Sequence, residues 1–348
     1  MKTIRNVKDY GVVLSPSTPG EPFYAYDGGG VREAVLKQVN GKFILTYDGA
    51  APGEKPDSYW NACEAESDDL LHWHKCGPTL LSSGLTHPEA SAEVYPDFCS
   101  ASSPWDFSDG DRWYRYYLAA DHCSPAGIPS FAYRTMLAVS DHPRGPWKKV
   151  CDEPGKEGHV CFPLGKPGDW DDETASPGEV IKVEGERLPY LMFYSGSCKG
   201  ETKRSIGLAR TDDPSACDNF RKEKGHFWVK DASPILPPSE DIENSSLFFE
   251  EESGYWYLFT NHIRDNSYTD AVWVYRTKDI FHWNAADKAI AMDARMSAFA
   301  KGAVGMPSVM RVGNKLALLY DGTVDGGIGH LHRHIGLAFL DLPLAFGN

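Results

Sequence analysis

The stretch GKFILTYDG, residues 41–49, recurs in altered form four more times along this 348-residue chain. The other copies are RWYRYYLAAD (112–121), LPYLMFYSG (188–196), GYWYLFTNH (254–262) and NKLALLYDG (314–322). Each is a β-rich apolar run that ends in a small or polar cluster. If Asp48, Asp121, Ser195, Asn261 and Asp321 are equivalent, the copies are spaced by 73, 74, 66 and 60 residues. This spacing fits one four-stranded propeller blade with its loops.

A second and a third strand are expected around each copy. A short apolar segment precedes each one, often with a proline, as in 33–36, 103–105, 176–181, 243–247 and 306–309. A further strand follows and ends near an aspartate, and the alternating patterns favour strand throughout. The sequence therefore predicts an all-β fold, a five-bladed β-propeller with four-stranded antiparallel blades around a central axis. One domain is expected over 1–348, with blades at about 28–85, 90–155, 165–235, 236–295 and 296–348, and an N-terminal segment that closes the ring.

The composition of the chain limits the classes of molecule that the protein is expected to bind. The formal charge of −14 argues against nucleic acid and anionic membranes, because phosphate binding needs a basic face. No apolar run has the length of a signal peptide core or a membrane span, so a cytoplasmic location is expected, or a periplasmic or secreted one if a signal was removed. The eight cysteines have no zinc spacing and are expected to be buried thiols rather than a disulfide framework. The oligomeric state is left open.

Function must come from the positions at which the copies differ. Each copy has two equivalent residues at the start of its inner strand. In chain order these pairs are Arg32-Glu33, Ser102-Ser103, Ala175-Ser176, Glu243-Asn244 and Gly305-Met306. Only the first and fourth carry a carboxylate. A charge beside a crowded channel is costly unless it is paired or used. Two facing carboxylates would suit hydrolysis of a glycosidic bond, whereas ion pairing, for example of Glu33 with Arg32, is the structural alternative.

The segments 32–43 and 243–259 resemble the first-blade and fourth-blade signatures of the five-bladed propeller glycoside hydrolases, the group around families 43, 32, 117 and 130. Family 43 is the closest pattern. The recurring Ile-Gly-Leu-Ala at 206–209 and 335–338 is also similar to this group. The resemblance implies that Glu33 is the general base and Glu243 the general acid.

Departures from the family pattern create further candidates. Glu33 stands where the family has aspartate, and Ser176-Pro177 stands where the third blade should carry an aspartate before proline. Asp172 or Glu173 is the expected substitute, although an acidic loop can simply be solvated. In the second blade, Asp97 is a further candidate carboxylate. Trp105 is a candidate sugar platform or a core residue.

Histidines and arginines complete the predicted site. His262 competes with Glu243 for the acid role, as the resemblance to family 117 permits. His330, His332 and His334 would share one side of an extended segment and could bind a metal or a hydroxyl-rich ligand. Arg32, Arg264 and Arg333 could recognise an acidic sugar or neutralise nearby carboxylates. No cofactor is expected to be required, although a divalent metal on the axis is possible.

The expected function is that of a glycosidase, exo-acting on a terminal sugar of an oligosaccharide and inverting. Loops at 50–58 and 122–130 are expected to wall the pocket. The alternatives are a phosphorylase like family 130, a retaining enzyme like family 32, and a non-catalytic carbohydrate-binding propeller.

Overall fold

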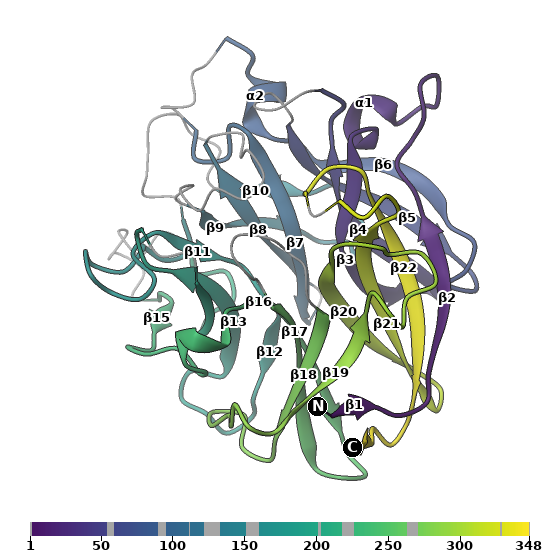
Figure 1. Ribbon diagram of the computed structural model, residues 1–348. Helices are drawn as coiled ribbons and strands as arrows, with labels where there is room; N and C mark the ends of the chain where they lie inside the picture. The colour runs from purple at the N-terminus through teal and green to yellow at the C-terminus, as the bar shows by residue number, and fades with distance from the viewer. Residues whose placement is uncertain are drawn as a thin grey trace.

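The computed structural model describes residues 2–53, 59–89, 95–110, 112–121, 133–150, 160–200, 203–217, 226–262, 271–327 and 329–347. Almost all of the regular structure in these ranges is β-strand (Figure 1). The α-helices in this part are the four-residue α1 (Tyr24–Asp27) and α2 (Ser83–Thr86), with a 3-10 turn at Pro238–Glu240. None of these helices has the length and apolar character needed to cross a bilayer.

The strands pair with their neighbours along the chain as antiparallel units. The first unit is β3 (Gly30–Val39), β4 (Lys42–Ala50), β5 (Trp60–Ser67) and β6 (His74–Leu80). The second is β7 (Ser100–Asp109), β8 (Arg112–Ala120), β9 (Arg134–Ser140) and β10 (Lys148–Lys149). The third is β11 (Thr174–Ser176) with β12 (Val180–Lys182), then β13 (Tyr190–Ser197), β14 (Arg204–Thr211) and β15 (Val229–Lys230).

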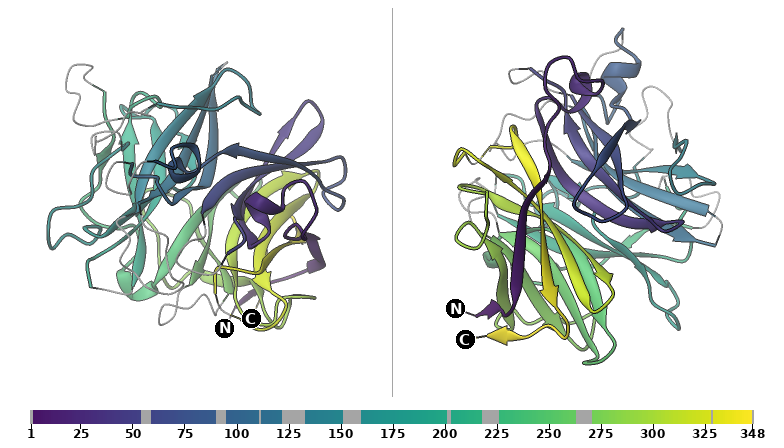
Figure 2. Two further views of the ribbon diagram at one scale, coloured as in Figure 1. Left: turned by 90° about the horizontal axis from the view of Figure 1, so that it is seen from above. Right: turned by 90° about the vertical axis from the view of Figure 1, so that its right-hand side faces the viewer.

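The remaining two units bring the chain ends together. The fourth unit is β16 (Ile242–Glu250), β17 (Tyr255–His262), β18 (Ala271–Thr277) and β19 (Lys288–Asp293). The last is β20 (Val304–Val312), β21 (Lys315–Thr323) and β22 (Arg333–Asp341), completed by the N-terminal strand β2 (Val7–Leu14). Figure 2 shows β2 running beside β22, and the short β1 (Thr3–Ile4) pairs with β23 (Phe346–Gly347). The predicted inner and third strands are confirmed as strands, except that the inner segment 176–181 of the third copy is interrupted between β11 and β12.

Apolar clusters hold successive units together, because each sheet buries both faces. One cluster joins the first and second units through Ala62, Tyr117 and Met136. Others lie between the second and third, third and fourth, and fourth and last units. A further cluster, which includes Leu45 and Leu337, joins the last unit to the first. The core is therefore a closed series of sheet-to-sheet contacts.

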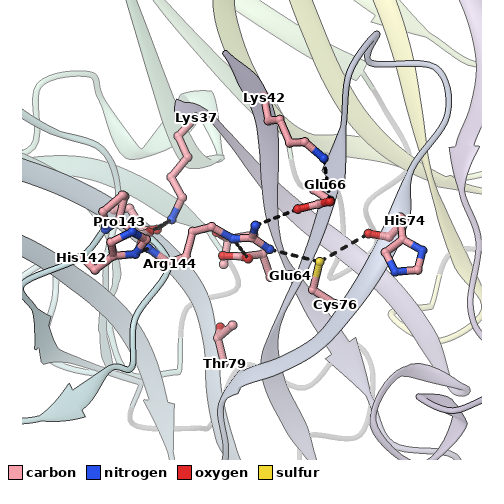
Figure 3. Close-up of polar contacts among 12 residues, drawn as sticks. Lys37, Lys42, Glu64, Glu66, His74, Cys76, Thr79, His142, Pro143 and Arg144 are labelled. Atoms are coloured by element: carbon pink, nitrogen blue, oxygen red, sulfur yellow. Dashed lines mark hydrogen bonds and ion pairs between the residues drawn. The ribbon is translucent and has the colours of Figure 1, made fainter. Parts of the chain in front are cut away.

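Charged side chains add to the contact between the first and second units (Figure 3). Lys37 donates to the Pro143 carbonyl at 2.5 Å. Arg144 reaches across from the second unit and binds Glu64 and Glu66, each at 2.7 Å. These contacts fix the outer parts of the two units relative to each other.

Two sequence expectations require correction. The strand register makes Leu118, not Asp121, the equivalent of Asp48, because Ser102 pairs with Leu118 as Arg32 pairs with Asp48. The aromatic run of the second unit continues three residues further before its polar end, so the sequence pattern was misaligned there. Cys99 is disulfide-bonded, whereas Cys63, Cys76, Cys161, Cys198 and Cys217 are free.

Candidate active site

One pocket collects residues from the inner-strand starts of four units. It encloses about 580 Å³ of empty space, counting its open mouth. Among the described residues, its lining comprises Arg32, Glu33, Asp48, Trp60, Ser100, Ser102, Ser103, Leu118, Ala120, Tyr133, Ser176, Pro177, Glu243, Asn244 and His330. Glu33 and Glu243, far apart in sequence, therefore face the same space.

A β-bulge at the start of the inner strand in the first, second, fourth and last units contributes to this convergence. The pairing register shifts after Arg32, Ser102, Glu243 and Gly305. The residues that follow have left-handed backbones, with φ of 48° at Glu33, 44° at Ser103, 61° at Asn244 and 52° at Met306. A bulge re-aims side chains at a strand end, so two consecutive residues per unit can contact the pocket. In the third unit the pair is Ser176-Pro177 rather than the expected Ala175-Ser176, because Ser176 pairs with Ser195.

Hydrogen bonds between units hold these bulges in place. A polar side chain on the second strand of one unit accepts the bulge N–H of the next unit. The bonds are Ser103 N–H to Asp48 (2.5 Å), Asn244 N–H to Ser195 (2.9 Å), Met306 N–H to Asn261 (3.4 Å) and Glu33 N–H to Asp321 (3.2 Å). The third unit lacks this hydrogen bond. Its residue at the bulge position is Pro177, which has no N–H, and the second-unit residue at the position equivalent to Asp48 is the apolar Leu118. The recurring polar cluster of the sequence thus fixes the residues that line the pocket.

Both oxygens of the Glu33 carboxylate have a partner. Arg32 contacts its Oε1, and the Ser103 hydroxyl donates to its Oε2. Arg32 also donates to Nδ1 of His330 at 2.5 Å and lies over the Trp60 ring, 5.0 Å from its centroid. These partners favour the ionised form of the carboxylate.

Glu243 has one engaged and one open oxygen. Arg204, from β14, contacts its Oε1 and lies 5.7 Å from the centroid of the Tyr133 ring. Its Oε2 is buried and has no hydrogen-bond partner among the described residues. An unpartnered buried carboxylate oxygen that lines a pocket is available to a ligand.

Asp48 is a third pocket carboxylate, which the sequence suggested only as a repeat marker. It is fully buried, and burial is the main cause that raises its pKa, opposed by Arg32 and the Ser103 N–H. Burial also raises the pKa of Asp321, opposed by Arg333 and Arg32. Asp321 accepts a hydrogen bond from the buried Arg333 at 2.5 Å. Arg333 is therefore a partner of the bulge-holding aspartate rather than a pocket-lining residue.

The other predicted carboxylates do not line this pocket. Asp172 accepts the backbone N–H groups of Gly168 (2.7 Å) and Lys199 (2.6 Å), which lower the pKa of its carboxyl. Glu173 lies beside it at the start of the third unit, and its backbone N–H donates to Ser197. The third carboxylate at the pocket is thus Asp48, supplied by the first unit, and the acidic loop serves to order its own backbone.

Two second-unit candidates also lie away from the pocket lining. Asp97 is buried against Lys149 at 2.6 Å and accepts the Ser83 hydroxyl at 2.5 Å. Trp105 is buried in β7, in register with Tyr116. The aromatic residues that do line the pocket are Trp60 and Tyr133.

Of the candidate histidines, His330 lines the pocket. His332 is exposed, with φ of 60° and its N–H bonded to Gly29 O at 2.8 Å. Nδ1 of His334 lies 2.9 Å from the Ser15 hydroxyl, and burial lowers its pKa. Nε2 of His262 lies 2.9 Å from the Tyr275 hydroxyl.

The sequence suggested that the histidines could bind a metal and that the arginines could bind an acidic sugar. Across the described ranges, no group of three or more His, Cys, Asp or Glu side chains is arranged to hold a metal ion. Arg264 lies outside the described residues.

Arg204 is the functional candidate that sequence reasoning missed, and a signal for it exists. It precedes Ser205 and the recurring Ile-Gly-Leu-Ala, as Arg333 precedes His334 and the second copy of that motif. The registers confirm the equivalence, since Arg204 pairs with Ser197 and Arg333 with Thr323. Both arginines contact a carboxylate at the inner end of the units.

Comparisons with known proteins support the fold. No protein-family model matches the sequence, and no curated protein matches it significantly. Solved structures do match over almost the whole chain. Zg3597, a family 117 glycoside hydrolase from the marine bacterium Zobellia galactanivorans, is 17% identical, with a TM-score of 0.63 over 99% of this chain and 92% of that one.

Two further structures match similarly. CoXyl43, a family 43 β-xylosidase/α-arabinofuranosidase from a compost microbial metagenome, is 12% identical, with a TM-score of 0.59 over 98% of each chain. BT0996, solved as a complex with RGII, is 14% identical, with a TM-score of 0.66 over 95% of this chain and 90% of that one. The chain therefore has the fold of glycoside hydrolases of families 43 and 117.

Proposed function

We propose that this protein is a glycoside hydrolase that removes a terminal sugar from an oligosaccharide. The observation that carries the proposal is that Glu33 and Glu243, from the first and fourth units, line one pocket and that Glu243 Oε2 has no hydrogen-bond partner among the described residues. Glycosidases use such a carboxylate pair on either side of the scissile bond. The shared fold adds to this argument, and one similar structure was solved with xylotriose and another as an RGII complex.

In this proposal Glu33 acts as the general base. Its contacts with Arg32 and the Ser103 hydroxyl favour the ionised form that accepts a proton from water. Glu243 acts as the general acid and protonates the leaving oxygen through Oε2. Arg204 favours the charged form of Glu243, and a bound sugar opposes it by removing water from the pocket.

Exo cleavage and inversion are parts of the same proposal. We infer exo cleavage because a pocket admits the end of a sugar chain more readily than its interior. A hydrolytic water would lie between Glu33 and the sugar, as inversion requires.

The architecture we infer for this enzyme is a five-bladed β-propeller. The units described above would be its blades, and the pairing of β2 with β22 would close the ring. This arrangement explains how the last unit can hold the bulge of the first through Asp321.

A substrate screen with two variants tests the function. Para-nitrophenyl glycosides and plant or algal oligosaccharides are offered to the wild type, Glu33→Gln and Glu243→Gln. Loss of a general acid or base should lower turnover by about 10²- to 10⁴-fold. Unchanged turnover in both variants would refute the assignment, and sugar binding without turnover by the wild type would leave a carbohydrate-binding protein.

Leaving-group dependence separates the two roles. A dinitrophenyl leaving group needs little protonation, so Glu243→Gln should retain most of its turnover on that substrate. Glu33→Gln should turn over slowly with both the para-nitrophenyl and the dinitrophenyl glycoside, because attack by water still needs a base. Proton NMR of the first-formed anomer distinguishes inversion from retention.

A phosphorylase is the second candidate, because Arg32 and His330 line the pocket and Arg204 flanks it. These groups could bind a phosphate that replaces water as the nucleophile. Turnover that requires added phosphate and yields a sugar phosphate would favour this candidate over hydrolysis.

A further inference from the structure

Three buried polar atoms at the pocket lack a hydrogen-bond partner among the described residues. They are Arg32 Nε, Asp48 Oδ2 and Glu243 Oε2. Asp48 is 0% exposed, Arg32 7% and Glu243 4%. Burying such groups without a hydrogen-bond partner is costly, and more so for charged groups. A polar ligand in the pocket could supply the hydrogen bonds that these atoms lack.

Two of these atoms face each other. Arg32 Nε, a donor, lies 3.7 Å from Asp48 Oδ2, an acceptor. This separation is too long for a direct hydrogen bond. One oxygen placed about 2.8 Å from each atom would bond to both. A hydroxyl group matches the two atoms chemically, because it can accept from Nε and donate to Oδ2 at the same time.

The two side chains are held in position by their other contacts. Asp48 Oδ1 accepts the Ser103 N–H at 2.5 Å, so rotation of the carboxylate would break that bond. Arg32 contacts Glu33 and His330 through its two Nη atoms and stacks near Trp60. Neither group can close the gap without losing these partners, so the pair is preorganised for a bridging ligand.

We propose that Arg32 and Asp48 together recognise one non-reacting hydroxyl of the substrate sugar. The inference rests on the proposed function, since it assigns the sugar to this pocket. Arg32 and Asp48 are then specificity-determining residues. The substrate class is a sugar whose hydroxyl at this position is free, and sugars that are deoxygenated or O-methylated there are rejected.

The rejection should be strong. A site built to bond a hydroxyl discriminates against the analogue that lacks it, because the buried polar groups are then left unpaired. Here one analogue would leave both the Arg32 Nε donor and the Asp48 Oδ2 acceptor without a hydrogen bond, with only their 3.7 Å ion pair remaining. We expect kcat/KM to fall at least about 100-fold for one deoxy position and much less for the others.

The test combines substrate and protein changes. The para-nitrophenyl glycoside that the wild type hydrolyses best is compared with its monodeoxy series, using the wild type and Asp48→Asn. In Asp48→Asn the Oδ2 acceptor becomes a donor, so the penalty at the sensitive position should shrink to within about tenfold. Ser102→Ala, which changes another pocket-lining side chain, should leave the full penalty in place.

Several outcomes would overturn the inference. One is a wild type that tolerates every deoxy position equally. Another is a folded Asp48→Asn protein that keeps the full penalty. If Asp48→Asn does not fold, the kcat/KM values of the wild type on the monodeoxy glycosides still test whether one hydroxyl is recognised.

The inference can also be tested without turnover. Melting temperatures of Glu33→Gln are measured with the parent glycosides and their deoxy analogues. Binding of a parent but not of one analogue supports the hydroxyl pair even if hydrolysis is never observed. Binding of none overturns it.

Discussion

Replacing Glu179 with glutamine should raise the stability of the protein in a pH-dependent way. Glu179 lies between β11 and β12 and faces the fourth unit. Its Oε2 accepts the Leu247 N–H at 2.6 Å and the Ser246 hydroxyl at 3.0 Å. Burial outweighs these hydrogen bonds and raises the pKa of the carboxyl from 4.5 to about 7.

The sign follows from proton linkage. Below pH 4.5 the carboxyl is neutral in both the folded and unfolded states, so it carries no ionisation cost. As the pH rises from 4.5 to about 7 the unfolded chain ionises first, and the free energy of unfolding falls. Above about 7 the full cost is present. A shift of about 2.5 units corresponds to about 3 kcal/mol.

Part of the Glu179 side chain remains accessible to solvent, which screens the charge. We therefore expect ionisation of Glu179 to lower the free energy of unfolding by a smaller amount, about 2 kcal/mol. Glutamine keeps an oxygen for the two donors and does not titrate. The advantage of Glu179→Gln over the wild type should therefore be about 1 kcal/mol larger at pH 8 than at pH 5, because part of the cost is already present at pH 5.

Urea unfolding at a series of pH values, followed by tryptophan fluorescence, measures this difference. The exposed Glu186, on the turn after β12, provides a control, and Glu186→Gln should show a difference from the wild type that is independent of pH. A Glu179→Gln advantage that is equal at pH 5 and pH 8, or larger at pH 5, would refute the reasoning.

Three further predictions concern the pocket and its frame. Arg204→Met should destabilise the fold by about 3–5 kcal/mol in thermal unfolding, because it leaves the buried Glu243 charge unpaired, and adding Glu243→Gln should restore part of the loss. Ser195→Ala should cost about 1–3 kcal/mol by the same assay, since the next unit's bulge N–H loses its acceptor, and no loss would show that this bond is dispensable. Ser103→Ala removes a donor that favours ionised Glu33, so the acidic limb of the kcat/KM profile should move to higher pH, and an unchanged limb would argue against the proposed base.

Much of the architecture could be predicted because strands carry local signals. Period-2 patterning and turn residues located the inner, second and third strands of all the units. Misalignments arose in the second unit, at Leu118, and in the third, at Ser176-Pro177. A bulge or a longer strand end adds residues without changing the alternation of apolar and polar residues nearby. The sequence pattern therefore does not reveal how many residues have been added, and the copies are misaligned there.

The candidate site was predictable only in part. Glu33 and Glu243 stood out because they break the pattern of otherwise similar copies. By contrast, Trp60 begins the third strand of its unit and Tyr133 directly precedes one, and nothing in their local sequence distinguishes them from core aromatic residues.

The sequence by itself determined the order of the strands, the units they form and two carboxylates at inner-strand starts, because these depend on local pattern and repetition. The tertiary structure alone decided which side chains from different units meet. It brought Asp48 against Arg32, set Arg204 on Glu243 and turned Asp172 toward its own backbone. The reason is physical: burial, pairing and hydrogen bonding of a charge depend on neighbours that are distant along the chain, and those neighbours are fixed only when the sheets pack.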